Sequence, residues 1–161
     1  MTTIRSVTAA DSNEWRRMRH ELWPDGSLAQ HQQDIDRYFA GDRREPAEVF
    51  LAFDAGAVAV GFAELSIRNI VDSCHTDRVA YLEGWYVVPE SRQKGIGRAL
   101  IQAAELWATR QGCTEFGSDA DIDNDISHAA HLRSGFAETG RVRTYRKKLG
   151  ADDENGNLVQ H

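Results

Sequence analysis

Basic residues and two glycines follow an apolar run in the middle of the chain, and together they could bind an anion. Arg92 and Lys94 precede Gly95 and Gly97, directly after an aromatic and valine-rich run that ends at Pro89. A pattern of helical period follows the glycines. The first amides of a helix have no acceptor within the helix and carry partial positive charge, to which the basic side chains add full charges. The sequence therefore predicts a strand, an anion-binding glycine loop and a helix, in that order.

Two better-known glycine loops do not fit these residues. The loop lacks the Gly-Lys-Ser/Thr ending of a P-loop, and residues 95–100 lack the third glycine of a dinucleotide fingerprint. What remains is Arg92-x-x-Gly95-x-Gly97 after a strand ending in Val-Val-Pro, which resembles the acetyl-CoA pyrophosphate loop of the GCN5-related N-acetyltransferases. On the loop residues alone, an ordinary strand-to-helix turn with surface basic residues is the alternative.

The resemblance implies that backbone amides of the loop hold the diphosphate of acetyl-CoA. It implies cofactor contacts from the strand, the loop and a later asparagine: Trp85, Tyr86, Val87, Val88, Arg92, Gln93, Lys94, Gly95, Ile96, Gly97, Arg98 and Asn124.

Gly84 interrupts the apolar strand between Glu83 and Trp85. Glycine weakens strand pairing and often marks a bulge or the close approach of another backbone, although a simple kink is an equal alternative. The family resemblance implies that this strand splays from its neighbour here, so that its free amides receive the pantetheine arm. The amides from Trp85 to Val88 would then stabilise the oxyanion.

Composition and charge disfavour several classes of protein. A chain of 161 residues has the length of one domain that buries a core without disulfides or metal. The net charge of -6 disfavours a nucleic-acid partner and slightly favours a cationic substrate. Cys74, Cys113 and the six histidines lack metal-ligand spacing, so we expect no metal site. Neither a membrane span nor a secretory signal is recognisable, so we expect a cytoplasmic protein.

Hydrophobic periodicity predicts alternating strands and helices. We expect strands at residues 4–7, 49–53, 58–67, 79–88 and 116–118, a final hairpin containing Thr144, Tyr145 and Arg146, and helices that end near Trp23, Gly41, Gly112 and Arg133. This order is that of an α/β or α+β fold. The resemblance implies the GCN5-related acyltransferase fold, with a mixed sheet of about six to seven strands, the fourth splayed, and about four helices. One acetyltransferase domain would cover residues 1–149, and a polar, disordered tail residues 150–161.

Several segments together resemble a narrower group, the chromosomal-type aminoglycoside 6'-N-acetyltransferases. They include Glu21-Leu22-Trp23-Pro24, Gly61-Phe62-Ala63, Leu82-Glu83-Gly84, Ser118-Asp119-Ala120, and Gly135-Phe136 with Tyr145-Arg146-Lys147. The order of these segments carries the resemblance. The chain departs from the group between Asn69 and Thr76, where relatives have a tyrosine-containing loop and this chain has Ile70-Val71-Asp72. The range of substrates need not therefore be the same.

The narrower resemblance implies acetyl transfer from acetyl-CoA to the 6'-amino group of an aminoglycoside, by direct attack on the thioester in a homodimer, giving antibiotic resistance. Glu83 would contact the amine or remove its proton through water. A carboxylate also stabilises an ammonium, so Glu83 as an anchor is the alternative. Asp119 would bind a second amino group, with a helix-cap or turn role as its alternative. Trp23 would flank a sugar ring and Tyr145 would protonate the departing thiolate, with core packing the alternative for both.

Two other functions fit the same residues. The acceptor could be another cationic amine, such as a polyamine, a peptide N-terminus or a metabolite. Alternatively, the loop could serve a CoA-binding sensor without catalysis. Turnover with different amines separates these three hypotheses.

Overall fold

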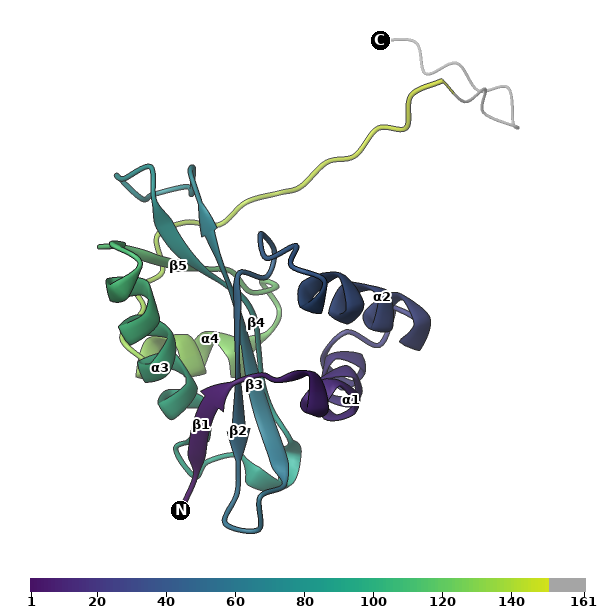
Figure 1. Ribbon diagram of the computed structural model, residues 1–161. Helices are drawn as coiled ribbons and strands as arrows, with labels where there is room; N and C mark the ends of the chain where they lie inside the picture. The colour runs from purple at the N-terminus through teal and green to yellow at the C-terminus, as the bar shows by residue number, and fades with distance from the viewer. Residues whose placement is uncertain (151–161) are drawn as a thin grey trace, which may run out of the picture.

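The chain is represented by a computed structural model, which describes residues 1–150; a five-stranded sheet forms their centre (Figure 1). Four strands pair antiparallel in chain order: β1 (Thr3–Ser6), β2 (Glu48–Phe53), β3 (Ala59–Arg68) and β4 (Val79–Val87). β5 (Phe116–Ser118) pairs parallel with β4. A parallel pair needs a crossover connection, which α3 (Ile96–Arg110) provides after the short turn η2 (Pro89–Ser91).

Helices cover both faces of the sheet, as Figure 1 shows. On one face lie α1 (Ser12–Leu22), preceded by the turn η1 (Ala9–Asp11), and α2 (Leu28–Phe39); α3 and α4 (Asp125–Arg133) lie on the other. Apolar residues at helical spacing account for the packing. The first face buries Trp15, Met18, Ile35 and Tyr38 against Val49, Leu51 and Phe62, and the second buries Ile96, Leu100, Ile101 and Ala104 against Ala52, Ala63 and Leu65. The predicted mixed α/β architecture is confirmed.

A bulge in β4 is the irregularity that matters for function. Glu64 of β3 pairs with Gly84, but the next residue, Leu65, pairs with Leu82, so Glu83 is the extra residue. On the other side, β5 pairs with β4 only from Ala80 to Leu82. β4 therefore separates from β5 at the height of Glu83, as expected for a splayed fourth strand.

The five strands of the described residues differ slightly from the six to seven expected, and the expected final hairpin does not form among these residues. The described residues form five strands, and residues 137–149 contain neither helix nor strand. This segment leaves the rest of the molecule as an extended yellow trace in Figure 1. It is rich in charged residues and offers few apolar side chains, so a hairpin folded back on its own chain would bury little apolar surface. Of the tail expected at residues 150–161, only Gly150 lies within the described part.

Candidate active site

The two loop glycines are needed for different reasons. Gly95 has a φ of 81°, which L side chains rarely adopt, and it immediately precedes α3. At Gly97 a Cβ atom would lie 3.3 Å from Trp85 Cζ2, and Trp85 Nε1 donates a hydrogen bond to Gly97 O over 3.1 Å. The loop thus turns sharply at Gly95 and packs closely on β4 at Gly97. The amides of Ile96, Gly97 and Arg98 belong to the first turn of α3 and have no acceptor within the helix.

A cleft of about 880 Å³ lies beside this loop, between β4 and α4. Most residues predicted to contact the cofactor line it: Trp85, Tyr86, Val87, Arg92, Gln93, Gly95, Ile96, Gly97, Arg98 and Asn124. The structure also places Leu22, Ile126, Ser127 and Arg133 there, which the sequence did not indicate. Asn124 is the N-cap of α4, since its side chain accepts from Ser127 N at 3.0 Å. The basic loop at one end and the strand along one side suit a long ligand with an anionic group.

Val88 and Lys94 do not line this cleft. Val88 N donates to Val60 O of β3 over 2.9 Å, so it is not available to a ligand. Hydrogen-bonded residues alternate in an antiparallel pair, so the Tyr86 amide also faces β3 and the amides of Trp85 and Val87 face the splayed side. The prediction that all four amides from residue 85 to 88 face the ligand is therefore wrong for two of them.

A serine–histidine contact, which sequence reasoning missed, fixes α4 to the end of β5. His131 Nε2 lies 2.7 Å from Ser118 Oγ, and His131 Nδ1 lies 2.7 Å from Ser127 O. A carbonyl oxygen can only accept, so Nδ1 donates and the ring orientation is set. The spacing of Ser127 and His131, one helical turn apart, is the signal in the sequence.

A second pocket of about 660 Å³ lies on the α1–α2 face of the sheet. Its lining is dominated by charged side chains: Arg19, Asp34, Arg37, Asp42, Arg44, Glu45, Glu64 and Glu83, together with Trp23 and Pro46. Leu22 lines the first cleft and Trp23 lines this pocket, so the last turn of α1 lies between the two. The structure thus brings Trp23 and Glu83 together, as predicted, but Asp119 does not line either pocket.

Glu83 is paired on both carboxylate oxygens. Arg68 donates from Nε to Oε1 over 3.0 Å and from Nη2 to Oε2 over 2.7 Å, and Ser66 Oγ also bonds Oε1. The Arg68 guanidinium lies 3.6 Å above the centre of the Tyr81 ring. Tyr81 in turn donates its hydroxyl hydrogen to Asp119, and burial together with this bond raises the pKa of Tyr81. One polar network therefore connects Glu83 with Asp119, and Asp119 is not a helix cap.

Trp23 lies directly on the bulge. A Cβ atom at Gly84 would be 2.5 Å from Trp23 Cη2, and the Trp23 and Phe62 ring centroids are 6.1 Å apart in an edge-to-face arrangement. Gly84 is thus required for the close approach of an indole ring. Trp23 packs against the core and also lines the pocket.

Tyr145 is not brought to either pocket of its own chain. It belongs to the extended segment after residue 136, and 87% of its surface is exposed. Within the part of the chain that is described, no group of three or more His, Cys, Asp or Glu side chains could hold a metal ion. No helix among those residues is long and apolar enough to cross a bilayer.

The model of the acetyltransferase (GNAT) family matches residues 15–136. The chain belongs to this family. It is 49% identical over 146 residues to an aminoglycoside N(6')-acetyltransferase type 1 of Klebsiella aerogenes, covering 91% of this chain and 96% of that relative. A relative of the same description from Stenotrophomonas maltophilia is 39% identical, covering 91% and 94%. Among solved structures, AAC(6')-Iy in complex with the bisubstrate analogue CoA-S-monomethyl-acetylneamine has a TM-score of 0.85 and 37% identity, covering 92% of this chain and 99% of that one.

Membership of the GNAT family makes the chain an acetyltransferase whose cosubstrate is acetyl-CoA. The residues of the cleft fit this molecule. The first-turn amides of α3, with Arg92 and Arg98, suit a diphosphate, and the unpaired side of β4 offers the amides of Trp85 and Val87 to an extended arm. Glu83, which lines the second pocket, and Trp85, which lines the cleft, are two residues apart on β4, beyond the part of this strand that pairs with β5.

Proposed function

We propose that this protein transfers the acetyl group of acetyl-CoA to the 6'-amino group of aminoglycoside antibiotics and thereby gives resistance to them in the cytoplasm. The single observation that carries the proposal is the placement of two pockets on either side of the last turn of α1, with Glu83 of β4 lining one and Trp85 of β4 lining the other. One suits the coenzyme, and the other has carboxylates and an indole for a polycationic sugar. The two relatives and the solved complex described above carry names of the same activity.

The amine would attack the thioester directly. An ammonium whose pKa is about two units above ambient pH is only about 1% deprotonated, equivalent to about 2.7 kcal/mol, so assistance in losing the proton matters. We assign that assistance to Glu83, which is 14% exposed as a side chain and lines the acceptor pocket. Because Arg68 already neutralises Glu83 in a two-pronged ion pair, an arriving ammonium competes with Arg68 for the carboxylate. The amide of Trp85 or Val87 would stabilise the oxyanion.

We assign Trp23 and Asp119 to recognition of the acceptor. Trp23 would lie against a sugar ring, as its position in the pocket supports. Asp119 uses one carboxylate oxygen to accept from Tyr81, which leaves the other oxygen for a second amino group. Asp119 is exposed and connected to Glu83 through Tyr81 and Arg68, so the network would keep the two acidic groups at a fixed separation.

We further propose a homodimer in which the segment 137–149 of each chain packs on its partner. This segment exposes Val142, Tyr145 and Leu149. β5 is the last strand of the sheet among the described residues, so its outer edge offers unpaired backbone groups to an extended segment. A two-fold exchange of segments would satisfy both edges and bring Tyr145 to the partner's cleft, where it could protonate the departing thiolate.

The activity is tested by following CoA thiol release with kanamycin, tobramycin, spermidine and short peptides in parallel. Saturable turnover with 6'-amino drugs, and none with drugs that have a 6'-hydroxyl, is the expected result. Turnover only with spermidine or peptides would assign another acceptor, and binding of acetyl-CoA without turnover on any amine would assign a sensor.

The dimer is tested by complementation. Glu83→Gln and Tyr145→Phe chains are co-expressed with different tags, and the mixed dimer is purified. If Tyr145 acts across the dimer, one of the two sites regains both wild-type residues, and the mixed dimer is more active than either parent. A mixed dimer no better than its parents would show that Tyr145 does not act in the partner's site.

A further inference from the structure

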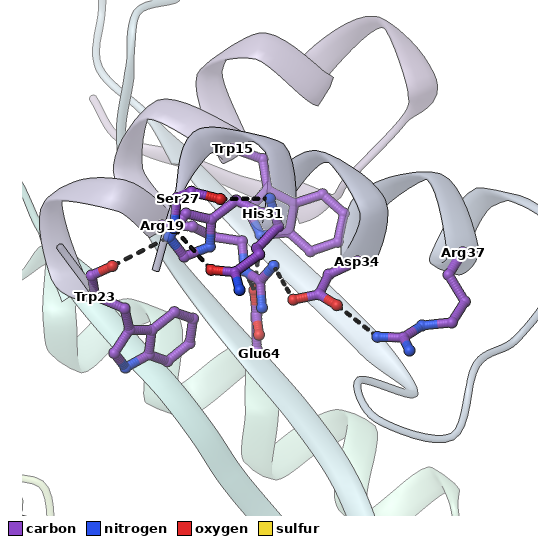
Figure 2. Close-up of polar contacts among 9 residues, drawn as sticks. Trp15, Arg19, Trp23, Ser27, His31, Asp34, Arg37 and Glu64 are labelled. Atoms are coloured by element: carbon purple, nitrogen blue, oxygen red, sulfur yellow. Dashed lines mark hydrogen bonds and ion pairs between the residues drawn. The ribbon is translucent and has the colours of Figure 1, made fainter. Parts of the chain in front are cut away.

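Glu64 is a carboxyl group in the middle of an apolar strand, and only 2% of the residue is exposed. Its Oε1 accepts from Trp15 Nε1 over 2.9 Å and lies 2.7 Å from Arg19 Nε. Arg19 is also buried, with 7% of its surface exposed. From the other end of its guanidinium, Arg19 donates to Asp34 Oδ2 over 3.1 Å, and Asp34 pairs with Arg37 (Figure 2). A chain of charges therefore connects β3, α1 and α2 beside the acceptor pocket.

The guanidinium of Arg19 also lies on the indole of Trp23. Its Cζ atom is 5.1 Å from the centre of that ring and 5.8 Å from the ring of Trp15. The Trp23 ring also packs on the backbone of Gly84, because a Cβ atom at Gly84 would lie 2.5 Å from Trp23 Cη2. The backbone of Trp23 is held as well, because His31 Nε2 donates a hydrogen bond to Trp23 O over 3.1 Å. Figure 2 shows Trp23, Arg19 and His31 gathered at the end of α1.

A buried ion pair is a poor means of stabilising a fold, because removing two charges from water costs about as much as their attraction returns. The geometry of this pair is also imperfect for stability, since Arg19 Nε makes no well-directed hydrogen bond among the described residues in spite of its short distance to Glu64. Glu64 and Asp34 do hold the guanidinium between them, over the Trp23 ring. A planar cation held from two sides is suited to orient an aromatic ring.

We infer that Arg19 and Glu64 are positioning residues for the acceptor: together they hold the Trp23 indole in the orientation that lets it flank the sugar. This inference rests on the proposed function, because it takes Trp23 as a contact of the aminoglycoside. The Arg19 guanidinium lies between the carboxylates of Glu64, at 2.7 Å, and Asp34, at 3.1 Å, and its Cζ atom is 5.1 Å from the centre of the Trp23 ring. The binding of the drug therefore depends on Arg19 and Glu64, which hold Trp23. The binding of acetyl-CoA does not depend on them, because neither residue lines the coenzyme cleft.

The variants Arg19→Lys and Glu64→Gln test the inference. Lysine keeps the charge of Arg19 and loses the planar face, whereas glutamine keeps the shape of Glu64 and loses the charge. Arg17→Lys is the matched control, because Arg17 lies on the same helix, forms ion pairs with Glu14 and Glu21, and lines neither pocket. We expect the KM for tobramycin to rise about tenfold in R19K and E64Q, with the KM for acetyl-CoA and all parameters of R17K unchanged.

Removal of Trp23 separates positioning from direct contact. In a Trp23→Ala background, R19K and E64Q should have less than about a twofold further effect on the KM for tobramycin, because the ring that they hold is gone. An equal rise in both backgrounds would mean that Glu64 or Arg19 touches the drug itself. A lower melting temperature with unchanged KM values would mean that the pair only stabilises the fold. Both results overturn the inference.

A second readout does not depend on any acceptor. Acrylamide quenching of each protein, minus that of its W23A partner, reports how accessible the Trp23 ring is. R19K and E64Q should make the ring more accessible, and R17K should not. Unchanged quenching overturns the inference even if the enzyme acts on aminoglycosides. Absence of tobramycin turnover in the wild-type protein would instead refute the proposed function, and quenching would still decide whether the pair holds Trp23.

Discussion

Gly84 offers a direct test of how the acceptor pocket is built. Its φ lies outside the left-handed region, so the backbone accepts alanine there, but the new Cβ would lie 2.5 Å from Trp23 Cη2 and 2.9 Å from Trp23 Cζ2. Carbon atoms in contact are separated by about 3.5 to 4.0 Å, so the indole has to move by about 1 Å or more in Gly84→Ala. Its tip is the part that moves, because the backbone of Trp23 is held by hydrogen bonds from His31 and to Arg19.

The size of the effect follows from the cost of overpacking. An added methyl group in a tight site costs about 1 to 3 kcal/mol. If the displaced ring bears that cost at the pocket, drug binding weakens between about 5-fold and 150-fold, since about 1.4 kcal/mol corresponds to a factor of ten. Global stability should change less, because alanine also restricts the unfolded chain and offsets up to about 1 kcal/mol.

The assay compares steady-state kinetics of G84A with those of Gly56→Ala. Gly56 lies in the turn between β2 and β3, where a Cβ would be at an ordinary 3.4 Å from Asp54 Oδ1. We expect a higher KM for tobramycin in G84A alone, an unchanged KM for acetyl-CoA in both, and no further loss when G84A is added to W23A. If G84A lowered kcat and left the KM for the drug unchanged, the ring would not flank the acceptor, and the bulge would matter for the thioester instead.

Four further predictions follow from the same geometry. Glu83→Gln should lower kcat about a hundredfold, and normal kinetics would exclude Glu83 from the chemistry. Asp119→Asn should raise the KM for tobramycin several-fold without changing that for acetyl-CoA, and Tyr81→Phe, which removes the bond to Asp119, should reproduce part of that rise in the same assay. Gly97→Ala should raise the KM for acetyl-CoA several-fold, because its Cβ would press on the Trp85 ring at 3.3 Å. Calorimetry should show a matching rise in the Kd for CoA. Burial raises the pKa of Glu64 from 4.5 to about 7, against the opposing effect of Arg19, so folding takes up a proton between pH 4.5 and 7. The free energy of unfolding should therefore fall as pH rises from 4.5 to 7. In E64Q this pH dependence, measured by denaturation at several pH values, should be weaker.

The parts of the site that the sequence predicted are those specified by local chemistry. A glycine with positive φ at the start of a helix, and a second glycine under an indole, leave a readable pattern at Gly95 and Gly97. The bulge at Glu83 was indicated by Gly84 for a similar reason, since a residue without a side chain in an apolar strand usually makes room for something. The amide of Val88 was assigned wrongly because the sequence does not reveal which amides of a strand face the neighbouring strand and which face away from it.

The final hairpin was predicted with Thr144, Tyr145 and Arg146 in its last strand, but a predicted strand does not say with which molecule it pairs. This segment exposes Val142, Tyr145 and Leu149, and the proposed homodimer would give these side chains a surface on which to pack. Glu64 illustrates the opposite limit. Its neighbours in sequence are apolar, and its partners Trp15 and Arg19 come from a helix 49 and 45 residues earlier, a separation that no local pattern encodes. A buried carboxyl without a partner would be costly, so its presence in β3 implies a cation from elsewhere in the fold. That cation is Arg19, and its contact with Trp23 is what gives the buried charge a consequence for the acceptor.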